Sequence, residues 1–191
     1  MSLFENCFAY WNGKSLSAVI GGGVFVASGS PTYTTVDRFN IAATYRFPTA
    51  ASDYLTSSAI TSATAKTAVV WIYIDSIVTT KSIIYHGADA INTASTSTIG
   101  SAYTTPTLYV NGVAGTTITD SNWIMLAVTS ATGSAATQPR VNNGTNTGLV
   151  CTVGEVFFFS SVLTAEQIKA LYDLTKSKYI YPFQRGERWC E

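Results

Sequence analysis

Carboxylate pairs are the first chemistry to look for in this chain, because a glycoside hydrolase needs two carboxyl groups flanking the bond that it cleaves. A strand presents two such groups on one face when they stand two positions apart. The eleven acidic residues of the 191-residue chain include no pair with that spacing within an expected strand. A pair that folding assembles from distant segments is the alternative that the sequence leaves open.

A histidine base is the second option, and His86 is the only histidine in the chain. It ends the apolar segment KSIIYH and precedes Gly87, so we expect a structural or surface histidine rather than a general base. No G-x-S-x-G sequence, which would present a nucleophilic serine, occurs. The sequence therefore predicts no catalytic residues and a protein that is not an enzyme.

Sugar binding is the third option, since lectin sites stack a sugar on Tyr or Trp and hold its hydroxyls with Asn, Asp and main-chain groups. Five residues of these types lie near expected turns and form the candidate carbohydrate site: Tyr103, Tyr109, Asn111, Asp120 and Trp123. The alternative is that the aromatic residues among them fill the core of a β-sandwich.

Oxygen ligands for calcium are the fourth option, and Ca²⁺ takes about six to eight of them. Asp53, Asp89 and Asp120 lie in or near expected loops, where Asn111, Asn142 and Asn143 could add oxygens. These residues show no spaced ligand motif, and Asp and Asn often serve only to form turns. We expect no cofactor, with calcium at the three aspartates as the alternative.

The three cysteines, Cys7, Cys151 and Cys190, are odd in number and lack metal-type spacing. They favour reduced thiols and assembly in a reducing compartment, with a Cys7–Cys190 disulfide between the two ends as the alternative. The first residues, MSLFENCFAYWNGK, show no basic segment followed by an apolar one. We therefore expect no secretion signal.

Charged residues make up only 12% of the chain, about half the usual fraction, and hydrophobic residues make up 47%. Ser, Thr, Asn and Gly must then cover the surface, which suits extended β-structure. The formal net charge is zero and no basic stripe is present, so we expect no nucleic-acid partner. No apolar run approaches membrane-spanning length, so we expect no membrane partner.

Short apolar segments separated by turn residues predict strands along most of the chain. We expect strands at 4–11, 24–27, 42–47, 53–56, 67–75, 81–86, 106–111, 123–129 and 151–159, with further candidates at 139–142 and 148–151. Segment 67–75 is apolar on both faces, which predicts a central strand with 81–86 as its neighbour. Segments 42–47 and 53–56 are expected to pair around Pro48. Hydroxyl-rich segments 57–65, 92–98 and 130–137 are expected loops.

Segment 164–176 is the one convincing helix. Thr164 and Gln167 fit a capping box, and Leu163 and Ile168 occupy the staple positions. The expected apolar stripe for docking on the sandwich is Ile168, Leu171, Tyr172 and Leu174. A sandwich domain then spans 1–176, followed by a C-terminal arm at 177–191. The arm is rich in aromatic and basic residues, and its predicted assembly contacts are Tyr179, Tyr181, Phe183, Arg185, Arg188 and Trp189.

Several segments resemble a laminin-G-like, concanavalin-A-like jelly-roll domain. The first half is carried by ASDYLTSS (51–58), TAVVWIYIDS (67–76) and KSIIYHG (81–87). LYVNGV (108–113) resembles the family's VNG hairpin, NWIMLAVTSATG (122–133) its tryptophan strand, and GEVFFFSSVLTAEQIKALYD (154–173) its closing segment. Two features depart from the family: the hairpin precedes the Trp123 strand, and Ile124 stands where the family has histidine. The hairpin at Asn142, Asn143 and Gly144 is the alternative equivalent.

The resemblance implies two stacked antiparallel sheets, an all-β sandwich with one short C-terminal helix. The fold hosts lectins, glycosidases, adhesion modules and structural virion parts, so it does not fix the function. By analogy we expect a non-catalytic structural or adhesion component of a virus particle, a phage tail, fibre or capsid decoration assembled in the host cytoplasm. Its partners would be other virion proteins or further copies of itself, and surface glycans. A free carbohydrate-binding module is the alternative, followed by a glycoside hydrolase.

Overall fold

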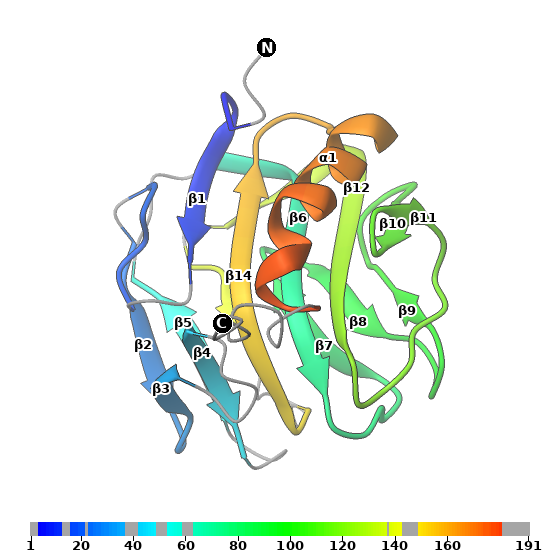
Figure 1. Cartoon of the computed structure of the whole chain (residues 1–191). Helices are drawn as coiled ribbons and strands as arrows, with labels where there is room; N and C mark the ends of the chain where they lie inside the picture. The colour runs from blue at the N-terminus through cyan, green and yellow to red at the C-terminus, as the bar shows by residue number, and fades with distance from the viewer. Residues whose placement is uncertain are drawn as a thin grey trace, which may run out of the picture.

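The computed structural model describes residues 4–12, 16–21, 23–36, 42–48, 53–58, 63–136, 138–142 and 149–180. Two antiparallel sheets stack face to face, and one short helix near the C-terminus covers one of them (Figure 1). The predicted fold class, an all-β sandwich with a single C-terminal helix, is confirmed. Within the described part of the chain, no helix has the length and apolar character needed to cross a membrane.

The larger sheet has eight strands and the smaller has six. The larger contains β1 (Cys7–Trp11), β3 (Thr32–Val36), β4 (Ala42–Phe47), β6 (Ala63–Ile74), β10 (Thr107–Val110), β11 (Val113–Ala114), β12 (Trp123–Ala136) and β14 (Cys151–Phe159). The smaller contains β2 (Phe25–Ser28), β5 (Tyr54–Ser57), β7 (Lys81–Tyr85), β8 (Asp89–Thr93), β9 (Ile99–Gly100) and β13 (Arg140–Val141). The helix α1 (Ala165–Thr175) runs into a 3-10 turn, η2 (Lys176–Lys178).

Strand order places β6 and β14 at the centre of the larger sheet, in the order β11-β10-β12-β6-β14-β4-β3, with β1 added beside β14. The smaller sheet has the order β2-β5-β13-β7-β8-β9. The prediction that 67–75 is a central strand is confirmed, because Val70 and Ile72 face the other sheet while Val69 and Trp71 face the helix. The prediction that 81–86 is its neighbour is wrong, since β6 pairs with β12 and β14.

The expected pairing of 42–47 with 53–56 is also wrong. β4 pairs with β3 and β14, whereas β5 pairs with β2 and β13 in the other sheet. Both strands alternate because each sheet turns one face to the shared core, where Tyr45 and Phe47 meet Leu55 from the opposite side. Alternation alone does not distinguish two strands that pair from two strands that face each other across a sandwich.

The prediction of a loop at 130–137 is wrong. β12 continues to Ala136 and pairs with β6 again at 63–65. Small and hydroxyl-bearing side chains in this segment suggested a loop, but main-chain pairing decided the structure. The register shifts between Thr129 and Ser134, and Gly133 has φ +59° within that irregularity. A Cβ atom at Gly133 would overlap the main-chain oxygen of Ala65, so glycine is required there.

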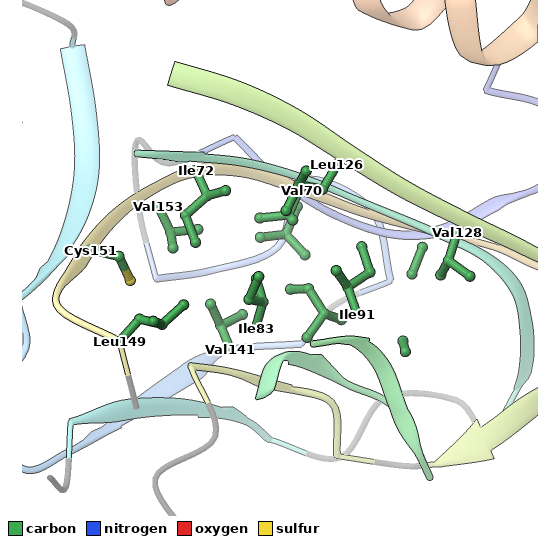
Figure 2. Close-up of a cluster of buried hydrophobic side chains, with 14 of the residues drawn as sticks. Val70, Ile72, Ile83, Ile91, Leu126, Val128, Val141, Leu149, Cys151 and Val153 are labelled. Atoms are coloured by element: carbon green, nitrogen blue, oxygen red, sulfur yellow. The ribbon is translucent and has the colours of Figure 1, made fainter. Parts of the chain in front are cut away.

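The main core lies between the two sheets, and Figure 2 shows its central side chains. The larger sheet contributes Val70, Ile72, Leu126, Val128 and Val153, and the smaller contributes Ile83, Ile91 and Val141. Leu149 and Cys151 fill the same layer close to the start of β14. Dense apolar packing of this kind stabilises the sandwich, because burying one large apolar side chain contributes about 1.5–3 kcal/mol to folding.

The helix docks on the outer face of the larger sheet and forms a second core with it. The capping box is confirmed, since the Gln167 main-chain N–H donates to Thr164 Oγ1 at 3.3 Å and the Thr164 N–H donates to Gln167 Oε1 at 2.9 Å. Leu171 is buried as expected, but Leu174 is 58% exposed. Thr175 takes its place on the buried stripe, where its hydroxyl accepts a hydrogen bond from Trp71 Nε1 at 2.8 Å.

Candidate functional site

The two outer faces of the sandwich differ in what covers them. On the larger sheet, α1 lies over β6 and β14 (Figure 1) and buries a cluster of aromatic and aliphatic side chains. On the smaller sheet, none of the described residues forms a helix over the outer face. The outward side chains of its described strands are therefore candidates for contact with a ligand.

Strand register aligns four of these outward residues in one line across the smaller sheet. Thr56 of β5 lies opposite Arg140 of β13, Arg140 lies opposite Tyr85 of β7, and Tyr85 lies opposite Asp89 of β8. Directly opposed residues of antiparallel strands point to the same face where the ladder is regular. The β7–β8 register shifts on either side of Ile84, so the outward position of Asp89 follows from its partial exposure next to the buried Ala90. We call these four residues, Thr56, Arg140, Tyr85 and Asp89, the outer row.

The outer row faces away from the core. Its sequence neighbours Leu55, Val141 and Ile84 are fully buried in the layer between the sheets. Successive residues of a strand point to opposite faces, so the row projects outward. All four of its side chains are partly exposed. Geometry thus gives the row access to a ligand from solvent.

The chemistry of the outer row combines a flat aromatic centre with polar ends. The Arg140 guanidinium carbon lies 5.7 Å from the centre of the Tyr85 ring, within cation–π range. Asp89 supplies a carboxylate acceptor at one end, and Thr56 supplies a hydroxyl that donates and accepts at the other. A ring flanked by hydrogen-bonding groups can hold a sugar by its C–H face and its hydroxyls together.

Further polar and aromatic side chains flank the row on the same face. Tyr54 stands two residues before Thr56 on β5 and is partly exposed. On the other side, Ser82 of β7 lies opposite Asn92 of β8, and both are partly exposed. The face therefore offers two tyrosines together with Arg, Asp, Asn and Thr side chains, whereas the hydroxyl oxygen of Ser82 is buried.

The residues that the sequence proposed for sugar binding lie elsewhere, and the aromatic ones are buried. Tyr103 is 5% exposed and belongs to the core between the sheets. Tyr109 and Trp123 belong to the core under the helix, where the Trp123 ring lies 4.8 Å from that of Tyr179. Filling the cores, the alternative that the sequence left open, is the role the structure gives them.

The two polar members of that proposed site have local surroundings of their own. Asn111 has φ +52°, and its side-chain oxygen accepts a hydrogen bond from the Met125 N–H at 2.9 Å, which fixes the β10–β11 turn. Asp120 is exposed in the loop before β12, where its main-chain oxygen accepts from the Asn122 amide at 3.0 Å. Asn111 bonds to Met125, two residues after Trp123, whereas Tyr103 belongs to the core between the sheets.

The candidate calcium residues belong to separate elements. Asp53, just before β5, is 1% exposed, and its carboxylate accepts the Ser30 N–H at 2.8 Å. Asp89 is part of the outer row, and Asp120 lies in the exposed loop before β12. Across the described segments, no three His, Cys, Asp or Glu residues gather as a metal-binding group. Asn142 is buried and bonds to the main chain of Asp53 and Leu149, and Asn143 lies outside the described residues.

His86 and two of the cysteines are buried. The His86 ring lies against the rings of Phe8 and Phe158, at 5.9 and 5.1 Å. Burial lowers the pKa of His86, and main-chain groups nearby oppose that effect only in part. Cys7 and Cys151 are free thiols, and burial raises the pKa of Cys7 to about 11, so its thiolate is disfavoured. Cys190, and with it the proposed disulfide, lies outside the described residues.

Glu155 is a buried carboxylate that the sequence did not single out. It lies in the β14 irregularity between Val153 and Val156 and is 1% exposed. Its Oε1 accepts the Tyr10 hydroxyl and the Lys178 ammonium, each at 2.6 Å. The acid therefore ties the first strand to the end of the helical segment and is engaged in structure.

Tyr179 is predicted from the sequence as an assembly contact, but the structure buries it. Its ring is 5% exposed and stacks on Trp71 with 4.5 Å between centres. Its hydroxyl accepts the Glu155 main-chain N–H at 3.0 Å. Tyr179 therefore packs within its own domain. The other predicted contacts lie outside the described residues: Tyr181, Phe183, Arg185, Arg188 and Trp189.

Comparison of the sequence with protein-family models gives no match, and comparison with curated proteins gives none either. Similar solved structures include the receptor binding domain of botulinum neurotoxin C/D mosaic serotype, with TM-score 0.55, 9% identity, and coverage of 88% of this chain and 51% of that one. The receptor binding domain of botulinum neurotoxin D matches with TM-score 0.58, 11% identity, and coverage of 91% and 54%.

A third similar structure is domain 4 of AbnA, a GH43 extracellular arabinanase from Geobacillus stearothermophilus, in complex with arabinotriose. It matches with TM-score 0.57, 12% identity, and coverage of 87% of this chain and 98% of that domain. The chain thus spans about half the length of the toxin domains and nearly all of the arabinanase domain. At these identities the likeness shows the β-sandwich fold, in domains that bind receptors or hold a carbohydrate.

Proposed function

We propose that this chain is a non-catalytic carbohydrate-binding domain and that the outer row is its sugar site. The observation that carries the proposal is the alignment of Thr56, Arg140, Tyr85 and Asp89 on the outer face of the smaller sheet, over which the described residues form no helix. Two β-sandwich neighbours of receptor-binding type and one with bound arabinotriose support a binding role. The arabinanase domain is the closer analogue in size, because the chain covers nearly all of it.

The absence of catalysis in this proposal rests on the carboxylates. Glycoside hydrolysis needs two carboxyl groups on either side of the scissile bond. Asp89 is the only acidic residue in the six described strands of the smaller sheet. The two buried acids, Asp53 and Glu155, already hold hydrogen bonds that build the fold. A sugar on the outer row would therefore meet one carboxylate and would be bound without being cleaved.

The test is a glycan array followed by calorimetric titration of the best ligand, with wild type and the variants Tyr85→Ala and Asp89→Asn. Loss of a ring contact or of a charged acceptor should raise Kd about tenfold, because each is worth roughly 1–3 kcal/mol. Asp120→Asn is the matched control, since it makes the same change on an exposed loop. Thermal melting confirms that each variant folds.

Two results would contradict the proposal. Binding that is unaltered by Tyr85→Ala and Asp89→Asn would place the sugar site elsewhere on the molecule. Weakened binding in Asp120→Asn, with both outer-row variants unchanged, would place the sugar site at the loop around Asp120, where the sequence predicts it.

Membership of a virus particle, as an adhesion or structural component, stays a prediction. It rests on the low charge content and on the aromatic arm at 177–191. The native size of the full chain, compared with that of a variant lacking the arm, tests it. Arm-dependent oligomers or incorporation into particles would support an assembled role, and a monomer in both cases would favour a free binding module.

A further inference from the structure

The outer row runs across the strands rather than along one of them, which fixes its direction and length. Its four residues come from four neighbouring strands, β5, β13, β7 and β8. Neighbouring strands lie about 4.8 Å apart, so the row extends for roughly 14 Å. The distance between neighbouring strands is close to the length that each sugar adds to an extended chain, so the row matches about three consecutive sugars.

Among the described residues, those that continue the line at both ends have short side chains. Beyond Thr56 the next residue in the line is Val26 on the edge strand β2, which is 59% exposed and has a short side chain. Beyond Asp89 lies Ala102, an exposed alanine whose N–H donates to the Asp89 main-chain oxygen at 2.8 Å. Neither residue can form a wall. A site that binds the end of a glycan needs such a wall, whereas a chain can run through a site without one.

The charges on the row favour a neutral ligand. Arg140 and Asp89 stand on either side of Tyr85 and carry opposite charges. Asp89 would repel the carboxylate of an acidic sugar at that position, and the chain as a whole has no net charge. Hydroxyl groups suit both residues, because Asp89 accepts hydrogen bonds and Arg140 donates them.

We infer that the outer row binds an internal stretch of about three sugars in a neutral, linear polysaccharide that crosses the strands of the smaller sheet. This inference rests on the proposed function and specifies its ligand. The polymer would lie over Val26 at one side and Ala102 at the other, with the Tyr85 ring under its central sugar.

The experiment is a length series. Affinity electrophoresis in gels containing arabinan, xylan, β-glucan or mannan identifies the polymer, and calorimetry then measures its mono-, di-, tri- and tetrasaccharide. Affinity should rise about tenfold or more from the mono- to the trisaccharide, because each added contact on the row contributes, and should then level off. Polygalacturonate serves as the acidic counterpart and should not bind.

A pair of edge-strand variants tests whether the polymer passes beyond the row. Val26→Trp places a large ring next to Thr56, and Val113→Trp makes the same change on β11, the edge of the larger sheet, where Val113 is 63% exposed. Val26→Trp should change the affinity for the polysaccharide several-fold in either direction, and Val113→Trp should leave it unchanged.

The outcomes separate the two proposals. A monosaccharide that binds as tightly as the trisaccharide, with binding still lost in Tyr85→Ala, would overturn the internal, linear mode and leave the proposed function in place. Polysaccharide affinity that is equal in Val26→Trp and wild type would also overturn it. Binding of no glycan, on the array or in the gels, would overturn both.

Discussion

The outer face of the larger sheet is buried under a helix, whereas the outer face of the smaller sheet carries partly exposed side chains. On the larger sheet, Trp71 and Phe157 are buried beneath α1 against its Leu171, and the face contributes to stability. On the smaller sheet, Tyr85 and Arg140 remain partly exposed and lie side by side in register. Aromatic residues are therefore poor markers of a binding site in this fold until the face that they occupy is known.

Truncation of an aromatic residue on each face should give the largest contrast. Trp71→Ala removes a fully buried ring that stacks on Tyr179 and donates to Thr175, so it should lower the free energy of unfolding by about 3–5 kcal/mol. Tyr85→Ala, on the exposed face, should lower it by about 1 kcal/mol or less. Urea denaturation of both variants measures the difference, and equal losses would show that the two faces do not differ as described.

Acidification should lower the free energy of unfolding through His86, which is buried in the sandwich. Burial lowers the pKa of His86 in the folded state, so the unfolded chain binds its proton at higher pH than the folded chain does. Stability is then fully present above about pH 6.5 and falls by up to about 1.4 kcal/mol per pH unit below it.

The matched variant for this effect is His86→Leu, which keeps an apolar side chain between Phe8 and Phe158. Urea denaturation at pH 7.5, 6.5 and 5.5 should show the fall for wild type and little change for the variant. The same fall in both proteins would assign the effect to other groups and would mean that the pKa of His86 is the same in the folded and unfolded chains.

The smallest effect is expected from an exposed leucine of the helix, where two leucines three positions apart differ in burial. Leu174→Ser should change the free energy of unfolding by about 0.5 kcal/mol or less, because Leu174 is 58% exposed. Leu171→Ala, a buried position on the same helix, should cost about 2–5 kcal/mol. A large loss in Leu174→Ser would mean that the helix lies on the sheet with the face that the sequence predicted.

Strong local patterns were enough to predict the elements at the centre of the fold. Apolar runs predict the strands at 67–75 and Cys151–Phe159, and the Thr164–Gln167 capping box with its apolar stripe predicts the helix. Sheet membership was not, because β4 and β5 face each other across the core and alternate as paired strands would. The second half of β12 was missed because main-chain pairing, rather than side-chain hydrophobicity, holds it in the sheet.

The candidate site was harder to predict for a related reason. Residue types near turns indicated Tyr109 and Trp123, yet these positions pack beneath the helix. The outer row depends on register between four strands, and no local pattern contains that information. A partial signal is present in Tyr54 and Thr56, which flank the apolar Leu55, but only the pairing through Arg140 brings them into one surface with Tyr85.

The central claim, that the smaller sheet carries the binding face, is tested most directly by mapping amide chemical shifts in the NMR spectrum as the best-binding oligosaccharide is added. The largest shifts are expected on Thr56, Tyr85, Asp89 and Arg140, with little change along α1. Shifts concentrated on the β10–β11 turn and the start of β12, around Asn111 and Trp123, would contradict it.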